Sequence, residues 1–284
     1  MGDRPGDYRI ERMSLPDVAL AIDRAAREGW NPGLNDAACF YAIDPSGFFA
    51  GVLDGRPIAA GSALVYDKDF AFCGLYIVEP NYRGKGYGLA LTKGRLDYIG
   101  ERNAGLDGVE NMTEKYARLG YRRAHRNIRH TFTPDTLRSV TAEIAPLAQV
   151  SFAELAAYDR KHFFAPRENF LMLWISQPHA VALALRDAGQ LKGYGVLRKC
   201  RTGYKIGPLF AEQSEIAEAL FNALCNHAIG EPVSIDIPEP NQAAMALAVR
   251  HDMRPNFACE RMYLRGDPGL PLDNIFGITS FEAG

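Results

Sequence analysis

The sequence predicts a mixed α/β fold arranged as two tandem domains, and chain length and segment order carry this prediction. The chain has 284 residues, which at roughly 150 residues per domain corresponds to about two domains, each able to bury its own core. Segments of strand and helix character alternate in the first half, and the same order returns in the second. We expect domains over residues 1–133 and 134–284, with the boundary at Thr133-Pro134-Asp135-Thr136.

The first half is expected to combine a hairpin with two strand–helix units, defined by apolar alternation, turn residues and caps. In chain order its segments are a strand at Tyr8–Met13, a helix at 14–27 capped by Ser14, hairpin strands at Gly47–Leu53 and Ile58–Tyr66 around Asp54-Gly55, a strand at Cys73–Val78, a long helix, a strand end at Val109–Met112 and a short helix at Thr113–Tyr121. Residues spaced three or four apart give the long helix its sheet-facing side, which excludes Arg95. They are Leu89, Thr92, Leu96 and Ile99.

A glycine-rich segment, Arg83-Gly84-Lys85-Gly86-Tyr87-Gly88, joins the strand at Cys73–Val78 to the long helix. Backbone N–H groups in the first turn of a helix lack helical partners and carry partial positive charge, so they hold phosphate when no side chain blocks the approach. A P-loop would need Ser or Thr after Gly-Lys, but Gly86 follows Lys85. A Rossmann turn needs G-x-G-x-x-G, whereas these glycines are spaced by two. A merely tight strand–helix turn stays open from this segment alone.

Two motifs in this order resemble those of the GNAT N-acetyltransferases. Val78-x-Pro80-x-x-Arg83-Gly84-x-Gly86-x-Gly88 is similar to the R-x-x-G-x-G loop with which that family binds the pyrophosphate of acyl-CoA. Tyr116-x-x-x-Gly120-Tyr121 is similar to the family's Y-x-x-x-G-[FY] ending. The strand and helix order of the first half is also that of a GNAT domain. The resemblance implies an acetyl-CoA-dependent N-acetyltransferase that uses direct transfer and no metal.

The resemblance also assigns roles to residues of the first half. Tyr116 would be the general acid that protonates the departing thiolate, and the backbone of the strand would pair with the pantetheine arm. A phenol suits this step because its pKa of about 10 lies close to that of a thiol, roughly 8 to 9. The other interpretation of Tyr116 is a helix tyrosine packed on the sheet with its hydroxyl at the surface. The residues placed around the coenzyme are Tyr76, Ile77, Val78, Arg83, Gly84, Lys85, Gly86, Tyr87, Gly88, Leu89 and Asn111.

The general base stays open. An alkyl amine is mostly protonated at neutral pH, so a carboxylate or a water chain has to take its proton. Glu79 at the strand end and Glu28 in a separate loop are candidates, and both are as well explained as solvated charges.

The second half repeats the order of segments without the chemistry, and so looks like a degenerate GNAT domain. Its expected segments are strands at Val181–Arg186, Lys192–Arg198, Tyr204–Phe210 and Val233–Ile237, and helices at Ile216–Ala228 and Asn241–Val249. Ala211-Glu212-Gln213-Ser214-Glu215 replaces the glycine loop, and its two carboxylates disfavour a pyrophosphate. No aromatic residue from Gln242 to Arg250 corresponds to Tyr116.

We expect the second half to form one wall of the acceptor site. The residues that suggest this can also be interpreted as members of buried ion pairs or as structural aromatic residues. Trp30 can plug a core edge, and Arg160 and Arg167 can pair with Asp159 and Glu168. The candidates are Trp30, Tyr158-Asp159-Arg160, Arg167 and Asp236-Ile237-Pro238-Glu239, and those retained as tentative acceptor contacts, together with the two base candidates, are Glu28, Trp30, Glu79, Asp236 and Glu239.

Composition limits the partners. Hydrophobic residues make up 47% and charged residues 23% of the chain, and the formal net charge is -2, so neither nucleic-acid binding nor a membrane association is expected. One basic cluster spans residues 115–130, which we expect to form the solvated edge of a final hairpin. The alternative is that one or two of its cations meet the 3′-phosphate of CoA.

Five scattered cysteines, odd in number and without C-x-x-C spacing, favour buried reduced thiols in the cytoplasm over disulfides or a zinc site. Met1–Gly6 has no apolar segment of a secretory signal and no myristoylation pattern. The expected acceptor is the amine of a small molecule. Two alternatives are transfer to a peptide or protein amine and a non-catalytic acyl-CoA sensor. The sequence leaves acyl length and oligomeric state open, a homodimer included.

Overall fold

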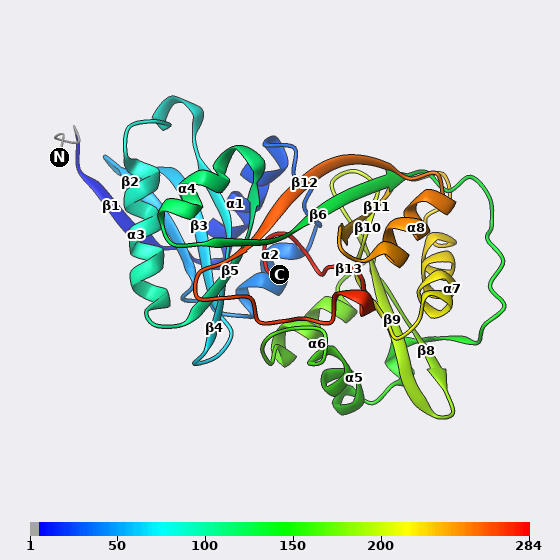
Figure 1. Cartoon of the computed structure of the whole chain (residues 1–284). Helices are drawn as coiled ribbons and strands as arrows, with labels where there is room; N and C mark the ends of the chain where they lie inside the picture. Colours follow the sequence, from blue (N-terminus) through cyan, green and yellow to red (C-terminus); the bar gives the residue numbers. More distant parts are fainter. Residues whose placement is uncertain (1–5) are drawn as a thin grey trace.

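The computed structural model describes residues 6–284, and its strands form one sheet that continues through both halves of the chain (Figure 1). The strand order is β1-β2-β3-β4-β5-β12-β6-β11-β10-β9-β8-β7, and β13 pairs with β10 beside this path. The strands are β1 (Tyr8–Arg12), β2 (Phe48–Leu53), β3 (Arg56–Val65), β4 (Phe70–Val78), β5 (Asn103–Val109), β6 (Arg122–Phe132), β7 (Ile144–Pro146), β8 (Val181–Asp187), β9 (Gln190–Lys199), β10 (Tyr204–Ala211), β11 (Val233–Pro238), β12 (Arg254–Tyr263) and β13 (Ile275–Gly277).

Helices cover both faces of this sheet. They are α1 (Leu15–Arg27), α2 (Asp36–Tyr41), α3 (Tyr87–Ile99), α4 (Thr113–Arg118), α5 (Phe152–Asp159), α6 (Glu168–Ser176), α7 (Ser214–Cys225) and α8 (Gln242–Arg250), with single 3₁₀ turns η1 (Pro80–Tyr82), η2 (Glu110–Met112), η3 (Leu147–Gln149) and η4 (Leu272–Asn274). The mixed α/β class is confirmed, as is the cap of α1, where Ser14 and Asp17 form a capping box. The sequence had given no expectation for α2, α5, α6, β12 or β13.

The prediction of which residues of α3 face the sheet is partly wrong. Leu89 is 52% exposed, whereas Arg95 is buried and takes a place on the sheet-facing side. Arg95 can be buried there because its Nε donates to the carbonyl oxygen of Ser62 at 2.8 Å, which gives the charged group a hydrogen-bond acceptor inside the core. Thr92 and Ile99 are buried as expected.

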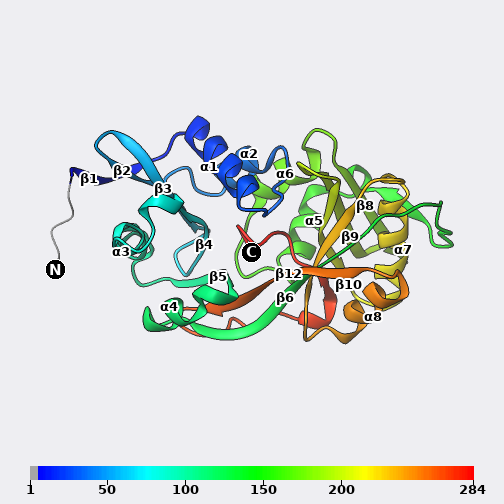
Figure 2. The same cartoon turned by 90° about the horizontal axis from the view of Figure 1, so that it is seen from above.

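The two halves exchange strands at the centre of the sheet. β12, from the second half, lies between β5 and β6 of the first, and β6 lies between β12 and β11. Figure 2 shows β6 and β12 running side by side across the molecule. The expectation that the basic segment forms a solvated edge is therefore wrong, because β6 has a strand on each side. Arg129 and His130 on β6 are buried, while Arg122 and Arg126 remain exposed.

The first half of the sheet has two different faces. On one face α3 and α4 pack over a core that includes Val78, Leu91 and Tyr121. On the other face α1 and α2 share a second core with α5 and α6, and this core contains Leu75, Ile77 and Trp174. Side chains alternate between faces along a strand, so β4 contributes to both cores. The second face is thus covered by helices from both halves of the chain.

Candidate acyl-CoA site

β4 and β5 pair for only part of their length. They run parallel from Phe70 opposite Asn103 to Cys73 opposite Leu106. Beyond Cys73, β4 continues to Val78 with β3 on one side, and Leu75 in this stretch has a positive φ of 48°. Backbone N–H and C=O groups of Tyr76–Val78 on the β5 side of this gap can therefore pair with amide groups of a ligand.

The glycine loop stands at the end of this gap. Gly84 and Gly86 have φ of 76° and 86°, a left-handed conformation that side chains strain, and a Cβ at either would meet nothing within 4 Å. Gly86 is the N-cap of α3, and no side chain in the described part of the chain caps this helix. The loop thus combines open space with the N-terminus of a 13-residue helix, which suits an anionic group.

At Gly88 the absence of a side chain avoids a steric clash with β4. A Cβ there would overlap the hydroxyl oxygen of Tyr76 and lie 3.0 Å from a methyl carbon of Val78. Gly88 therefore lets β4 pack closely against the first turn of α3. Lys85 and Leu89 are exposed beside this turn, and Asn111 is exposed in η2 after β5.

Arg83 is held in place before any ligand binds. Its Nε donates to the carbonyl oxygen of Val78 at 2.7 Å, and one terminal nitrogen donates to a carboxylate oxygen of Glu28 at 2.6 Å. Glu28, one of the two base candidates, is thus an ion-pair partner of the loop arginine. The pair is partly exposed, so its net stabilisation is about 0 to 1 kcal/mol.

Tyr116 lies on α4, on the same face of the sheet as α3. Its ring packs against Gly108 of β5 and lies 6.2 Å from the ring of Tyr121, centroid to centroid. Burial raises the pKa of the Tyr116 phenol, and Arg95 opposes the shift only in part. Among the residues that the structure describes, nothing forms a hydrogen bond with this hydroxyl. Tyr116 is therefore protonated at neutral pH and can donate to a ligand.

The tentative acceptor residues fall into three groups. Glu79 is paired with Arg24 at 3.5 Å and Arg56 at 3.1 Å, close to the glycine loop. Arg129 joins Trp30 to Asp236, because it donates to the carbonyl oxygen of Trp30 at 3.0 Å and to both carboxylate oxygens of Asp236 at 2.6 and 2.8 Å.

Glu239 forms the third group by itself. Its carboxylate lies 3.7 Å from a guanidinium nitrogen of Arg126. For Asp236, burial alone would raise the pKa, but Arg129 brings it below its ordinary value. Asp236 is therefore ionised and already paired.

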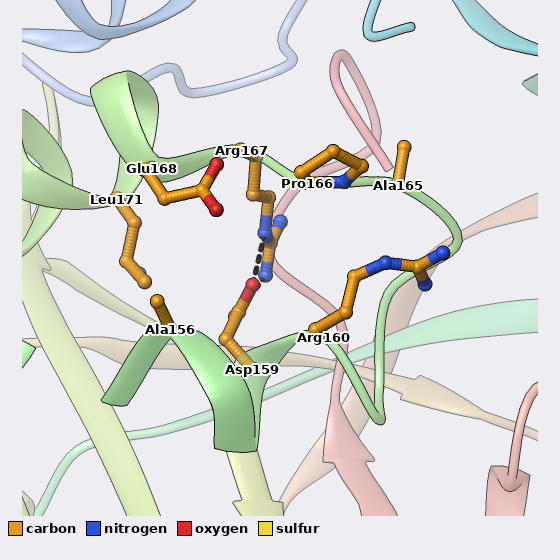
Figure 3. Close-up of a pocket in the computed structure, with 8 residues that line it drawn as sticks. All are labelled: Ala156, Asp159, Arg160, Ala165, Pro166, Arg167, Glu168 and Leu171. Carbon is orange, nitrogen blue, oxygen red and sulfur yellow. Dashed lines mark hydrogen bonds and ion pairs between the residues drawn. The ribbon is translucent and has the colours of Figure 1, made fainter. Parts of the chain in front are cut away.

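Asp159 and Arg167 form a buried, two-point ion pair with distances of 2.6 and 2.7 Å (Figure 3). This bears out the interpretation of Arg167 as a partner of Asp159. Arg167 also donates to Thr279 at 2.9 Å, which anchors the last residues of the chain. A cavity of about 200 Å³ lies between α2 and α6, and its lining includes Tyr66 from the first half and Arg167 from the second.

The second half has the same kind of strand gap, but the chain itself fills it. β10 pairs with β11 only from Tyr204 opposite Val233 to Ile206 opposite Ile235. Beyond that, β10 pairs with β13, Leu209 opposite Gly277 and Phe210 opposite Ile275. The apolar run at residues 275–278 is the local sequence signal for this strand, and it does not indicate where the strand pairs.

The five cysteines are buried and unpaired, as the sequence predicted. In residues 6–284 no three His, Cys, Asp or Glu side chains come together in a way that would hold a metal ion. No described helix combines the length and the apolar character that a membrane span requires.

Two family descriptions match the chain in succession. The acetyltransferase (GNAT) family matches residues 15–121, and an acetyltransferase (GNAT) domain matches residues 155–277. The protein belongs to the GNAT acetyltransferases and has their tandem form.

Holothin acyltransferase from Pseudoalteromonas sp. (strain SANK 73390) is 28% identical to this chain, over 95% of this chain and 92% of that protein. A Pyrococcus horikoshii structure assigned as an acetyltransferase has the same fold, with a TM-score of 0.85, 19% identity and coverage of 100% and 98% of the two chains. A tandem GNAT protein from the clavulanic acid biosynthesis pathway superposes with a TM-score of 0.65 and 14% identity, over 93% of this chain and 99% of that one. The protein is thus a GNAT-type acyltransferase.

Proposed function

We propose that the protein transfers an acetyl group from acetyl-CoA directly to the amine of a small molecule, in the first half of the chain. One observation carries the proposal: the open edge of β4, the glycine loop and Tyr116 share one strand gap on the face covered by α3 and α4. In this arrangement the α3 N-terminus and Arg83 hold the pyrophosphate, and Tyr76–Val78 pair with the pantetheine amides. Tyr116 gives its proton to the sulfur that leaves the thioester.

The limited space between the halves favours a small acceptor over a peptide. The face of β4 opposite α3 lies in a core shared by α1, α2, α5 and α6, and the cavity of about 200 Å³ lined by Tyr66 and residues 166–170 lies on the same side of the molecule. A peptide chain would need a long open groove, whereas a largely covered strand face suits a small ligand. The Pseudoalteromonas relative, whose name gives holothin as its acceptor, supports the same choice.

A calorimetric titration with acetyl-CoA, followed by a thiol-release assay over small amines and peptides with free N-termini, tests the proposal. We expect binding with a Kd of about micromolar and thiol release that depends on a small amine. Release with peptides alone would replace the small acceptor by a peptide. Binding without release from any acceptor would indicate a sensor, and absence of binding would refute the coenzyme assignment.

A further inference from the structure

The last ten residues of the sequence, which we term the C-terminal segment (275–284), cross from the second half into the first. After β13, the N–H of Ile278 donates to the carbonyl oxygen of Asp236 at 2.9 Å. Near the other end, the hydroxyl of Tyr66 donates to the carbonyl oxygen of Ala283 at 2.6 Å. Figures 1 and 2 both place the end of this segment between the two halves.

This segment reaches β4 at the point where β4 leaves β5. A Cβ on Gly74 would overlap the carbonyl oxygen of Glu282, so the backbone of Glu282 lies directly on Gly74. Gly74 is the first residue of β4 beyond the last pair with β5. Phe281 and Ala283 pack in the core that contains Leu75, on the face opposite α3 and Tyr116. Glu282 therefore stands at the strand gap on the side from which an acceptor can approach a thioester held on the α3 side.

The carboxylate of Glu282 is buried without a partner. The residue is 4% exposed, and no hydrogen bond or ion pair joins its side chain to any residue within 6–284. Its nearest cations are committed elsewhere: Arg129 to Asp236, Arg198 to Asp36 and Lys205 to the carbonyl oxygen of Trp30. Lys205, Arg129 and Arg198 attract this carboxylate, but none of them forms an ion pair with it, and an unpaired buried carboxylate is costly to fold around.

Glu282 and Tyr116 both interact electrostatically with Cys259. Burial raises the pKa of the Cys259 thiol, and the charge of Glu282 adds to that shift. Cys259 in turn contributes to the raised pKa of Tyr116, after burial and other groups. Cys259 pairs with Val109, the last residue of β5. A proton acceptor and a proton donor thus stand within electrostatic reach of the same thiol, at the gap.

We propose that Glu282 is the general base of the transfer, so that the second half supplies a catalytic residue to the first. This step rests on the proposed function. Glu282 takes one proton from the acceptor ammonium and the amine nitrogen forms the new C–N bond as the C–S bond breaks. Tyr116 protonates the thiolate and recovers a proton from the acylated nitrogen. The proton on Glu282 passes to solvent, so one ammonium and one thioester give one amide, one thiol and one proton.

The environment of Glu282 raises the pKa of its carboxylate, which suits a general base. Burial raises its pKa above the ordinary value, and Lys205 opposes that shift. A carboxylate with a raised pKa is a stronger base than a solvated one. The titratable groups that interact with it come from five elements: Lys205 of β10, Asp36 of α2, Arg129 of β6, Arg198 of β9 and Cys259 of β12.

The same shift predicts how folding depends on pH. Because the folded pKa is raised, the protonated form stabilises the fold fully below the ordinary pKa, and this stability is lost as the pH rises through the folded value. Glutamine cannot ionise, so Glu282→Gln should melt at an equal or higher temperature than the wild type at about pH 7.5, with the difference shrinking toward about pH 4.5. An ion-pairing role would instead lower the melting temperature of the variant.

The test compares wild type, Glu282→Gln, Glu282→Asp and, as a control, Glu212→Gln, a carboxylate paired with Lys192 in the second half. We expect Glu282→Gln to lower kcat about 100- to 10,000-fold with acetyl-CoA affinity unchanged, and to abolish the loss of kcat at low pH. Glu282→Asp should recover part of the rate, and Glu212→Gln should match wild type.

Each other outcome has one meaning. Wild-type protein that transfers acetyl to no acceptor would refute the proposed function itself. Wild-type transfer that Glu282→Gln leaves unchanged in rate and pH profile would overturn the base assignment and leave the function standing. Loss of CoA binding, or a lower melting temperature at about pH 7.5, in Glu282→Gln would also overturn it. If Glu282→Gln does not fold, Glu282→Asp decides, because an unshifted low-pH limb in that variant excludes Glu282 as the titrating group.

Discussion

The strand gaps of the two halves have the same origin and different occupants. In the first half β4 separates from β5 after Cys73, and the gap opens onto a glycine loop. In the second half β10 separates from β11 after Ile206, and β13 closes the gap with strand pairs of its own. Parallel strands that diverge expose unpaired backbone groups, which have to be satisfied by a ligand or by the chain. The fold therefore produces a strand gap in each half, and the local sequence determines whether the gap stays open to a ligand or is closed by another strand.

The start of the helix that follows each gap shows why one gap can take a ligand and the other cannot. α3 begins at Gly86 in a loop with space around two glycines. α7 begins after Gln213, and Glu212 beside it is tied to Lys192 at 2.9 Å. A phosphate meets open amides at the first helix and a carboxylate at the second. The second half has kept the fold of a coenzyme site and lost its anion chemistry.

The largest expected effect comes from making the first helix start resemble the second. Gly86→Glu places a strained side chain and a carboxylate at the anion site, so acetyl-CoA affinity should fall by at least about 1000-fold. The matched control is Gln213→Glu at the start of α7, which should leave affinity unchanged. Isothermal titration measures both. Equal affinity in wild type and Gly86→Glu would sink the loop assignment.

Weakening the segment that fills the second gap should destabilise the fold and open no second site. Phe276 of β13 is 1% exposed, so Phe276→Ala should lower the free energy of unfolding by about 3–5 kcal/mol. Val249→Ala, at a residue that is 75% exposed, should change it by less than about 0.5 kcal/mol. Denaturant titration gives these values.

Calorimetric stoichiometry of Phe276→Ala completes this test. We expect one acetyl-CoA per chain, as in wild type, because α7 has no glycine loop. A second equivalent would show that β13 alone keeps the second half from binding the coenzyme, and the comparison of the helix starts would then be wrong.

The first gap was predictable from sequence, and its acceptor side was not. The loop at Arg83–Gly88 and the run Tyr116–Tyr121 are recognisable because each carries its signal in consecutive residues. Arg129 and Asp236, by contrast, are 107 residues apart and meet only because β6 pairs with β11. Glu282 has no local motif. Its position depends on the exchange of strands and on the path of the C-terminal segment, which are tertiary features.

Tyr116→Phe separates catalysis from coenzyme binding. If the phenol protonates the thiolate, kcat should fall roughly 10- to 1000-fold while acetyl-CoA affinity stays unchanged. Tyr121→Phe is the matched control, because its hydroxyl lies in the same core, 3.5 Å from the sulfur of Cys73. We expect less than about a threefold change there. A larger loss in Tyr121→Phe than in Tyr116→Phe would move the acid role to Tyr121.

The smallest effect is expected at the ion pair that holds the loop arginine. Glu28→Gln removes the carboxylate 2.6 Å from Arg83, which frees that guanidinium for phosphate and should tighten acetyl-CoA binding about two- to fivefold, more at low ionic strength. Glu79→Gln is the control, because Glu79 pairs with Arg24 and Arg56 instead. Binding is measured by titration at two salt concentrations. If Glu28→Gln instead lowers kcat about 100-fold with affinity unchanged, the base lies on the loop side of the gap, because only a group that takes the amine proton would act on kcat alone.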